Sequence, residues 1–272
     1  MNEAAIAQTA SSGVLWPRKA DVLGVKVSCV DYAAAVSCII AAAKSHRPSV
    51  VACYAVHAIV TASRDKSLRK KVNSFSMITP DGQPVRWALN ALHGAKLSDR
   101  VYGPELMRRV CEAAADEGIS IYLYGGTPEV LARLEHNLSV RSSGPHIGGS
   151  EAPPFRALTN EENDAACRQI NQSGARIVMI GLGCPKQDLF AAHNYDRIDG
   201  VQLCVGAAFD FHAGVKPMAP SWMQRWGLEW LFRLWCEPRR LWRRYLVTYA
   251  VFSARVALAI TKLPFRRLRE SA

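Results

Sequence analysis

The sequence predicts an α/β fold in which helices sandwich a parallel sheet, followed by a basic, helical appendage at the C-terminal end. Short apolar runs of four to eight residues alternate with helical patterns of ten to fifteen residues as far as about residue 205. This alternation is typical of a parallel sheet covered on both faces. From Ser221 onward only helical patterns follow. The 272 residues are 49% hydrophobic and 21% charged, which allows a sizeable core and excludes a disordered chain.

The predicted elements follow one another in a regular order. The strands are Val22–Cys29, Ser49–Tyr54, Ser76–Thr79, Ile119–Tyr124, Arg176–Ile180 and Val201–Val205. The helices are Tyr32–Lys44, His57–Asn73, Pro104–Glu117, one from about Pro128 to Leu138, one from a Thr159/Glu162 capping box to about Gln172, and one after Pro185. The Ser-, Gly- and Pro-rich stretch Arg141–Pro154 is predicted as a loop. The arrangement is Rossmann-like, so ligands are expected beyond the carboxyl ends of the strands.

We divide the chain into a flexible N-terminal segment (1–20), an α/β core (21–215) and the appendage (216–272). The N-terminal segment and the core together hold 22 basic and 20 acidic residues, whereas the appendage holds 12 basic and 3 acidic residues. Five of the seven tryptophans also lie in the appendage: Trp222, Trp226, Trp230, Trp235 and Trp242. Lys, Arg and Trp on one helix are typical of the lipid interface, so an anionic membrane surface is the expected partner. A solvated helix with a few core tryptophans is the simpler alternative.

The appendage is expected to lie on a membrane rather than cross it. Pro238 fits the first turn of a helix, and its continuation Leu246–Ile260 is apolar but interrupted by Arg255. At about 1.5 Å per residue, this stretch falls well short of a hydrocarbon core about 30 Å thick. The first fifteen residues lack a basic start followed by an apolar core, so no secretory signal is expected. We therefore predict a cytoplasmic protein, peripherally associated with the inner face of the cytoplasmic membrane.

Several classes of site are not expected. The eight cysteines include no C-x-x-C pair, which argues against a zinc site, and a cytoplasmic chain argues against disulfides. Neither a D-x-D pattern nor a P-loop occurs, so we predict no metal and no cofactor. Nucleic acid is suggested by charge alone and is opposed by the apolar, Trp-rich appendage, so it is not expected as a partner.

Two strand ends carry residues that could bind or react with a ligand. Asp81 follows a strand, next to Gly82, and its carboxylate could serve as a general base. From the residues alone, a turn in which this side chain caps the next helix is favoured. Gly125 and Gly126 lead from a strand into a helix N-terminus, where backbone N–H groups can approach a phosphate. A plain tight turn explains these two glycines equally well.

Two further strand ends have the same character. Gly183 and Gln187 lie in Gly181–Asp188, where a strand passes through glycines into a helix whose first turn faces the expected crevice. An ordinary strand–helix turn is the alternative. Asp210 follows the last strand between two phenylalanines, where it is either semi-buried and functional or part of a capped turn.

Taken together, these segments resemble the WecG/TagA/CpsF family of bacterial glycosyltransferases (glycosyltransferase family 26). The likeness covers roughly residues 21–250, in the family's order. The matching stretches are Pro80–Gly82, Asp99–Leu106, Gly181–Asp188, Val205–Gly214, Ala219–Trp222, Gly227–Leu234, Glu237–Arg240 and Arg243–Tyr245.

The resemblance implies an inverting, metal-independent glycosyltransferase in cell-surface polysaccharide biosynthesis. The donor would be a UDP-sugar of the N-acetylmannosamine, N-acetylmannosaminuronic acid or glucose type. The acceptor would be a polyprenyl-diphosphate-linked saccharide. The family's tendency to self-associate also makes a homo-oligomer an expectation.

The resemblance also suggests roles for individual residues. Asp81 matches the proposed general base that deprotonates the acceptor hydroxyl. The residues expected at the donor are Gln187 and Asp210, which match polar pocket residues, and Gly125, Gly126 and Gly183 in the glycine turns. The tail arginines Arg233, Arg240 and Arg243 match residues thought to fold over the site and bind diphosphate, a task that suits the forked guanidinium.

Two positions depart from the family's pattern. Cys53-Tyr54-Ala55 stands where the family often has Thr-x-Asn, and Met218 stands where it tends to have Arg, with Lys216 nearby. The first departure leaves the sugar specificity open. It also supports the alternative of a non-catalytic, membrane-associated member that binds a nucleotide-sugar or scaffolds a polysaccharide assembly complex. A nicotinamide-dependent dehydrogenase would fit the alternation but lacks its glycine fingerprint.

Overall fold

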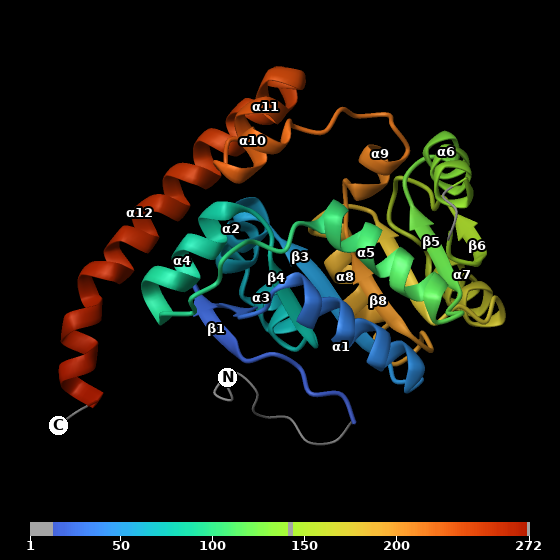
Figure 1. The fold of residues 1–272 in the computed structure, drawn as a ribbon, viewed down its shortest axis with the longest axis horizontal. Coiled ribbons are helices and arrows are strands. Elements are labelled where there is room, and N and C mark those ends of the chain that lie inside the picture. Colours follow the sequence, from blue (N-terminus) through green and yellow to red (C-terminus); the bar gives the residue numbers. More distant parts are fainter. Residues whose placement is uncertain (1–12, 141–143, 271–272) are drawn as a thin grey trace.

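Six parallel strands form the central sheet of the computed structural model, which describes residues 13–140 and 144–270 (Figure 1). The strands are β3 (Ser49–Tyr54), β4 (Met77–Pro80), β5 (Ile121–Gly125), β6 (Ile147–Glu151), β7 (Ile177–Gly181) and β8 (Val201–Cys204). Their order is β4-β3-β8-β7-β5-β6, and every neighbouring pair is parallel. The predicted α/β class with a parallel sheet is therefore confirmed.

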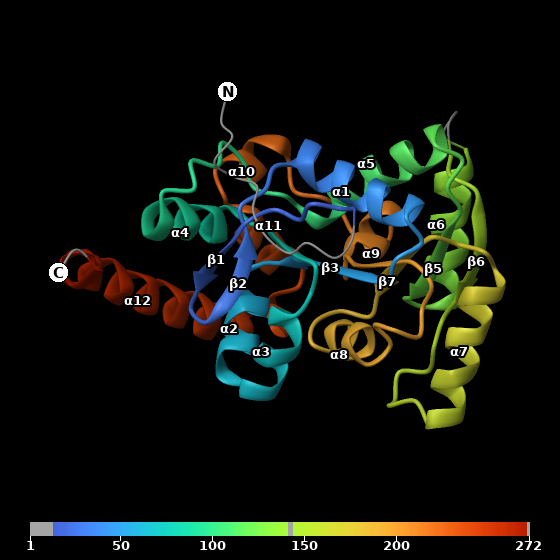
Figure 2. The ribbon, with the colours of Figure 1, turned by 90° about the horizontal axis from the view of Figure 1, so that it is seen from below.

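Helices cover both faces of this sheet (Figure 2). One face is covered by α1 (Tyr32–Lys44), α5 (Gly103–Asp116), α6 (Pro128–Ser139) and α9 (Ala208–His212). The other is covered by α2 (Val56–Arg64), α3 (Lys66–Asn73), α7 (Asn160–Gln172) and α8 (Lys186–His193). Successive strand residues alternate between the two layers, as the pleat requires: Val51 joins the first apolar cluster, and Val50 joins the second.

The N-terminal part of the core is a hairpin, not the single strand predicted over Val22–Cys29. The antiparallel strands β1 (Lys19–Val22) and β2 (Val25–Ser28) are joined by Leu23 and Gly24, with φ angles of 57° and 90°. A two-residue turn with two positive φ angles favours glycine and matches the twist of a hairpin. The Ser28 hydroxyl accepts from the Ile78 N–H at 3.2 Å, which ties the hairpin to β4.

The predicted flexible segment 1–20 lies partly outside the described residues, which begin at 13. Within its described part, Val14 is buried, and the Leu15 carbonyl accepts from the Cys38 thiol at 3.4 Å. This stretch is therefore packed along the core before β1 begins.

Two other predictions of local structure are wrong, and one helix was missed. The single helix His57–Asn73 is two helices, because the side chain of Asp65 accepts from the N–H groups of Ser67 and Leu68 and caps α3. The predicted loop Arg141–Pro154 contains the edge strand β6. Helix α4 (Gln83–His93) was not predicted.

The C-terminal part is helical, as predicted from residue 221 onward, and consists of α10 (Ser221–Arg225), α11 (Glu229–Cys236) and α12 (Pro238–Glu270). Helix α12 packs on α11, α2 and α4. In Figure 1 it runs along the side of the molecule where α2 and α4 lie. Leu241, Tyr245 and Phe252 are buried in these contacts. In the described part of the chain, no helix is both long enough and apolar enough to cross a bilayer.

Candidate active site

A cavity of about 1050 Å³ opens at the carboxyl ends of the strands. The residues that follow five of the strands contribute to its wall: Ala55 after β3, Asp81 after β4, Gly126 after β5, Gly183 after β7 and Asp210 after β8. Residues of α11 and α12 also line it, among them Glu229, Arg233 and Arg240. The cavity therefore lies where an open parallel sheet is expected to bind its ligands.

Asp81 is a half-buried carboxylate on the wall of this cavity. Its Oδ2 accepts from the backbone N–H of Gly103, the first residue of α5, at 3.3 Å. It does not cap the following helix: the N-cap of α4 is Gly82, and no side chain bonds there. The capping turn that the residues alone favour is thus wrong, and the carboxylate faces a space open to a ligand.

The surroundings of Asp81 have opposing effects on the pKa of its carboxyl group. Burial raises the pKa of Asp81 to about 6, and the positive charges of Arg100 and Arg233 limit the rise, while the negative charge of Glu229 adds to it. A carboxyl group with this pKa is ionised at neutral pH yet more basic than an exposed aspartate. These are the properties that a general base needs.

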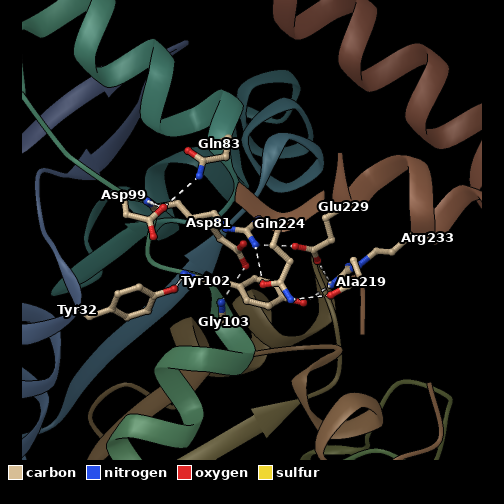
Figure 3. A network of polar contacts seen from close by, with 11 residues as sticks. Tyr32, Asp81, Gln83, Asp99, Tyr102, Gly103, Ala219, Gln224, Glu229 and Arg233 are labelled. Atoms are coloured by element: carbon tan, nitrogen blue, oxygen red, sulfur yellow. Dashed lines mark hydrogen bonds and ion pairs between the residues drawn. The ribbon is translucent and has the colours of Figure 1, made fainter. Parts of the chain in front are cut away.

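Glu229 binds two arginines that act on Asp81, and Figure 3 shows it beside one of them, Arg233. Its Oε2 lies 2.8 Å from Nη2 of Arg100, in the core, and its Oε1 lies 2.9 Å from Nη2 of Arg233, on α11. Arg233 also donates to the Tyr102 hydroxyl at 3.3 Å. Arg100 and Glu229 are both buried. Arg100 and Glu229 were not among the expected site residues, since the i,i+4 spacing indicates Glu229–Arg233 but nothing local indicates a partner 129 residues away.

The glycine turns have different roles in the structure. Gly125 (φ 124°) does not line the cavity, and a Cβ at this position would lie 2.7 Å from the carbonyl carbon of Gly181. Close packing of two strands therefore explains this glycine. Gly126 and Gly183 line the cavity, and the Gly183 N–H donates to Oε1 of the buried Gln187 at 3.1 Å.

Two ion pairs place further charged groups in the cavity wall. Asp210 on α9 pairs with Lys216, with 2.7 Å between Oδ2 and Nζ. Arg240 on α12 pairs with Glu237, which also lies 3.6 Å from Lys216. All four side chains line the cavity. Lys216 thus takes a defined position beside the expected donor residue.

Arg243, the last of the arginines expected at the site, lies outside the cavity. Arg243 is exposed, does not line the cavity, and lies over the ring of Trp242 at 5.8 Å. Its neighbour Arg244 does line the cavity. The structure therefore brings together most of the expected residues but neither Gly125 nor Arg243: the set is Asp81, Gly126, Gly183, Gln187, Asp210, Arg233 and Arg240.

Within residues 13–140 and 144–270, no group of three or more His, Cys, Asp or Glu side chains is placed to hold a metal ion. The cations that line the cavity are instead arginines and lysines, which suit phosphate oxygens.

A parallel sheet with a cavity at its carboxyl edge, lined by carboxylates and several arginines, defines an α/β protein that can handle a phosphorylated ligand. Comparison with known families is more specific. Residues 20–266 match the model described as the glycosyl transferase WecG/TagA/CpsF family. The chain belongs to this family and is a glycosyltransferase.

Proposed function

We propose that the protein transfers a sugar from a UDP-sugar to a polyprenyl-diphosphate-linked saccharide in cell-surface polysaccharide biosynthesis. The observation that carries this proposal is Asp81, an ionisable carboxylate in a cavity that Arg233 and Arg240 also line. The α/β core, 21–215, would hold the donor. The appendage, 216–272, would cover the acceptor at the inner face of the cytoplasmic membrane.

The proposed reaction is a single displacement without a metal. The carboxylate of Asp81 takes the proton from the acceptor hydroxyl, whose oxygen attacks the anomeric carbon. A new C–O bond forms as the bond to the UDP oxygen breaks, so the configuration inverts. A positioned base contributes about 10²–10⁴-fold to such a rate. Arg233 and Arg240 would stabilise the negative charge that develops on the departing diphosphate.

Donor binding is assigned to the side of the cavity formed by β5, β7 and β8. Gly183 leaves room there for a ligand close to the backbone, whereas a Cβ at Gly126 would lie 3.2 Å from the Val130 side chain. Gln187 holds the β7–α8 turn through Gly183, and Asp210 offers a carboxylate held by Lys216. The family's donors of N-acetylmannosamine, N-acetylmannosaminuronic acid and glucose type all remain candidates.

The appendage offers an exposed surface suited to lipid. Four of its tryptophans are largely exposed, and Trp235 is the most exposed at 85%. Large exposed aromatic side chains among arginines are typical of a helix that lies at a membrane interface. We assign the outward-facing Arg243 to this surface and not to the cavity.

A donor screen tests the proposed activity. The protein, on liposomes carrying a polyprenyl-diphosphate-linked GlcNAc or glucose acceptor, is given each UDP-sugar in EDTA while UDP release is measured. We expect release with one donor, dependent on the acceptor and insensitive to EDTA. No release with any donor, together with intact UDP binding, would instead favour the non-catalytic scaffold that binds a nucleotide-sugar.

A further inference from the structure

Lys216 faces two carboxylates, one on each side of the connection between the core and the appendage. Its Nζ lies 2.7 Å from Oδ2 of Asp210, on α9, and 3.6 Å from Oε1 of Glu237, the residue between α11 and α12. Glu237 also pairs with Arg240, on α12. These four side chains form a row of alternating charge that runs from α9 to α12, and all four line the cavity.

The backbone holds Lys216 on the core side of this connection. The N–H groups of Val215 and Lys216 both donate to the carbonyl of Asp210, at 2.9 and 3.1 Å. The segment that leads from α9 to α10 thus turns back on α9 before it continues to the appendage (Figure 1). The contact of Lys216 with Glu237 therefore links the core to the α11–α12 junction, by which we mean residues 233–241.

This link differs from the other ionic contact between core and appendage. The pair of Arg100 with Glu229 has a length of 2.8 Å, and both side chains are less than 10% exposed. The pair of Lys216 with Glu237 is longer, and its side chains are 33% and 32% exposed. Longer and more exposed ion pairs contribute little stability. The link through Lys216 is therefore the one whose strength a ligand in the cavity can change.

The position of Asp210 shows how a ligand would act on this link. The ammonium group of Lys216 divides a single charge between two carboxylates. A ligand group that donates a hydrogen bond to Asp210 neutralises part of that carboxylate and leaves more of the lysine charge for Glu237. Without the lysine, the two carboxylates, both within 3.6 Å of the same nitrogen atom, would repel each other.

We propose that Lys216 is a positioning residue, which orients the Asp210 carboxylate toward the donor and makes donor affinity depend on the packing of the α11–α12 junction. The choice of the donor as the ligand rests on the proposed function. Coupling between two sites is reciprocal, so a donor that binds beside Asp210 also stabilises the junction. Lys216 acts through Asp210 and Glu237 and takes no part in the bond-forming step.

Isothermal titration calorimetry with UDP and hydrogen–deuterium exchange over residues 233–241 test this role. In the unchanged protein, UDP should slow the exchange. Lys216→Met should bind UDP about five- to tenfold more weakly and lose this protection. Lys216→Arg, which keeps the charge, should restore both to within about twofold. The matched control is Lys44→Met, which removes an ion pair of 2.6 Å to Glu117 outside the cavity and should change neither.

Glu237→Gln separates the two parts of the role. Asp210 keeps its lysine in this variant, so UDP should bind with a smaller loss than in Lys216→Met. The link to the junction is lost, so UDP should no longer slow exchange over residues 233–241. Thermal unfolding checks that every variant is folded.

The results that would overturn the role are distinct from those that would overturn the proposed transfer. Equal UDP affinity and equal protection in Lys216→Met and Lys44→Met would overturn the coupling. A loss that Lys216→Arg fails to restore would also overturn it, since charge would not be the cause. No binding of UDP to the unchanged protein would contradict both the proposed donor and the coupling to it. These assays need neither acceptor nor turnover, so a protein that shows the coupling but transfers no sugar would contradict only the proposed transfer.

Discussion

Asp81 shows how one residue acquires reactivity from its position. The carboxylate lies after β4, accepts a single backbone hydrogen bond from Gly103, and still borders the cavity. Burial alone would favour its neutral form, while Arg100 and Arg233 favour the charged form. The two influences leave the pKa of this carboxyl group at about 6.

The pH dependence of turnover should report this balance. Asp81 acts as a base only when ionised, and its pKa is raised to about 6, so kcat/KM should be constant above pH 7 and fall as the pH drops through about 6. Initial rates of UDP release between pH 5 and 8 measure this. A fall centred near pH 4 would contradict the effect of burial. Asp81→Asn should lose about 10²–10⁴-fold above pH 7 and should lack the fall near pH 6.

The residues next to Asp81 in the sequence do not predict its role. Around Asp81 the sequence shows a Pro-Asp-Gly turn, and such a turn by itself favours helix capping. The residues that change its meaning are distant: Gly103 lies 22 positions away, and Glu229 reaches it from α11. The family resemblance, not the local pattern, indicated the role that we propose.

Helix α11 is fixed to the core through Glu229. This carboxylate is buried between Arg100 and Arg233, so one side chain joins the core to the appendage. Removing one member of a buried ionic group leaves its partners uncompensated, which costs far more than the loss of an exposed pair.

Glu229→Gln should therefore lower the free energy of unfolding by about 3–5 kcal/mol, because Arg100 would stay buried without its paired carboxylate. Urea denaturation measures this. The control is Glu237→Gln, whose partners Arg240 and Lys216 are more exposed, and its cost should stay below about 1 kcal/mol. Equal costs would show that the buried group does not hold α11.

The packing of β5 on β7 makes a second prediction at this scale. In Gly125→Ala, the new Cβ would lie 2.7 Å from the Gly181 carbonyl carbon, at a φ of 124°, so destabilisation of more than about 2 kcal/mol is expected. Gly174→Ala has open space around a φ of 70° and should cost only about 1 kcal/mol. Comparing the two by thermal unfolding separates the clash from the backbone strain, and similar losses would contradict the close approach.

Elements with strong local signals were predicted well. Tyr32–Lys44 and Ser49–Tyr54 have the predicted bounds, and the Thr159/Glu162 capping box is present. The failures have physical reasons. Strand β6, in the stretch predicted as a loop, contains Gly148 and Gly149. A Cβ at Gly149 would lie 2.7 Å from the Tyr122 ring, so packing requires a glycine there. Because glycine is rare in strands, the sequence of β6 does not indicate a strand.

At the scale of the molecule, the exposed tryptophans of the appendage set the expected affinity for membranes. Burying a large apolar side chain contributes about 1.5–3 kcal/mol of favourable free energy. The double variant Trp226→Ser and Trp235→Ser should therefore bind vesicles containing anionic lipid at least tenfold more weakly. Both side chains are more than 70% exposed, so their loss leaves the core intact.

Co-sedimentation with vesicles measures this binding, and added salt should weaken it in the unchanged protein because arginines contribute to the attraction. Val140→Ser, which changes an exposed apolar residue of the core, is the control and should bind normally. If the double variant also binds normally, the appendage is not the membrane-binding surface.

The position of β8 has a consequence for how the protein is made. This strand is the last of the sheet to be synthesised, yet it lies in the centre, paired with β3 on one side and β7 on the other. Until Cys204 has left the ribosome, the nascent sheet consists of two halves, each with an unpaired edge that can attract other chains. We therefore expect those edges to need protection during synthesis, and we expect a chain cut short before β8 to aggregate rather than to be partly active.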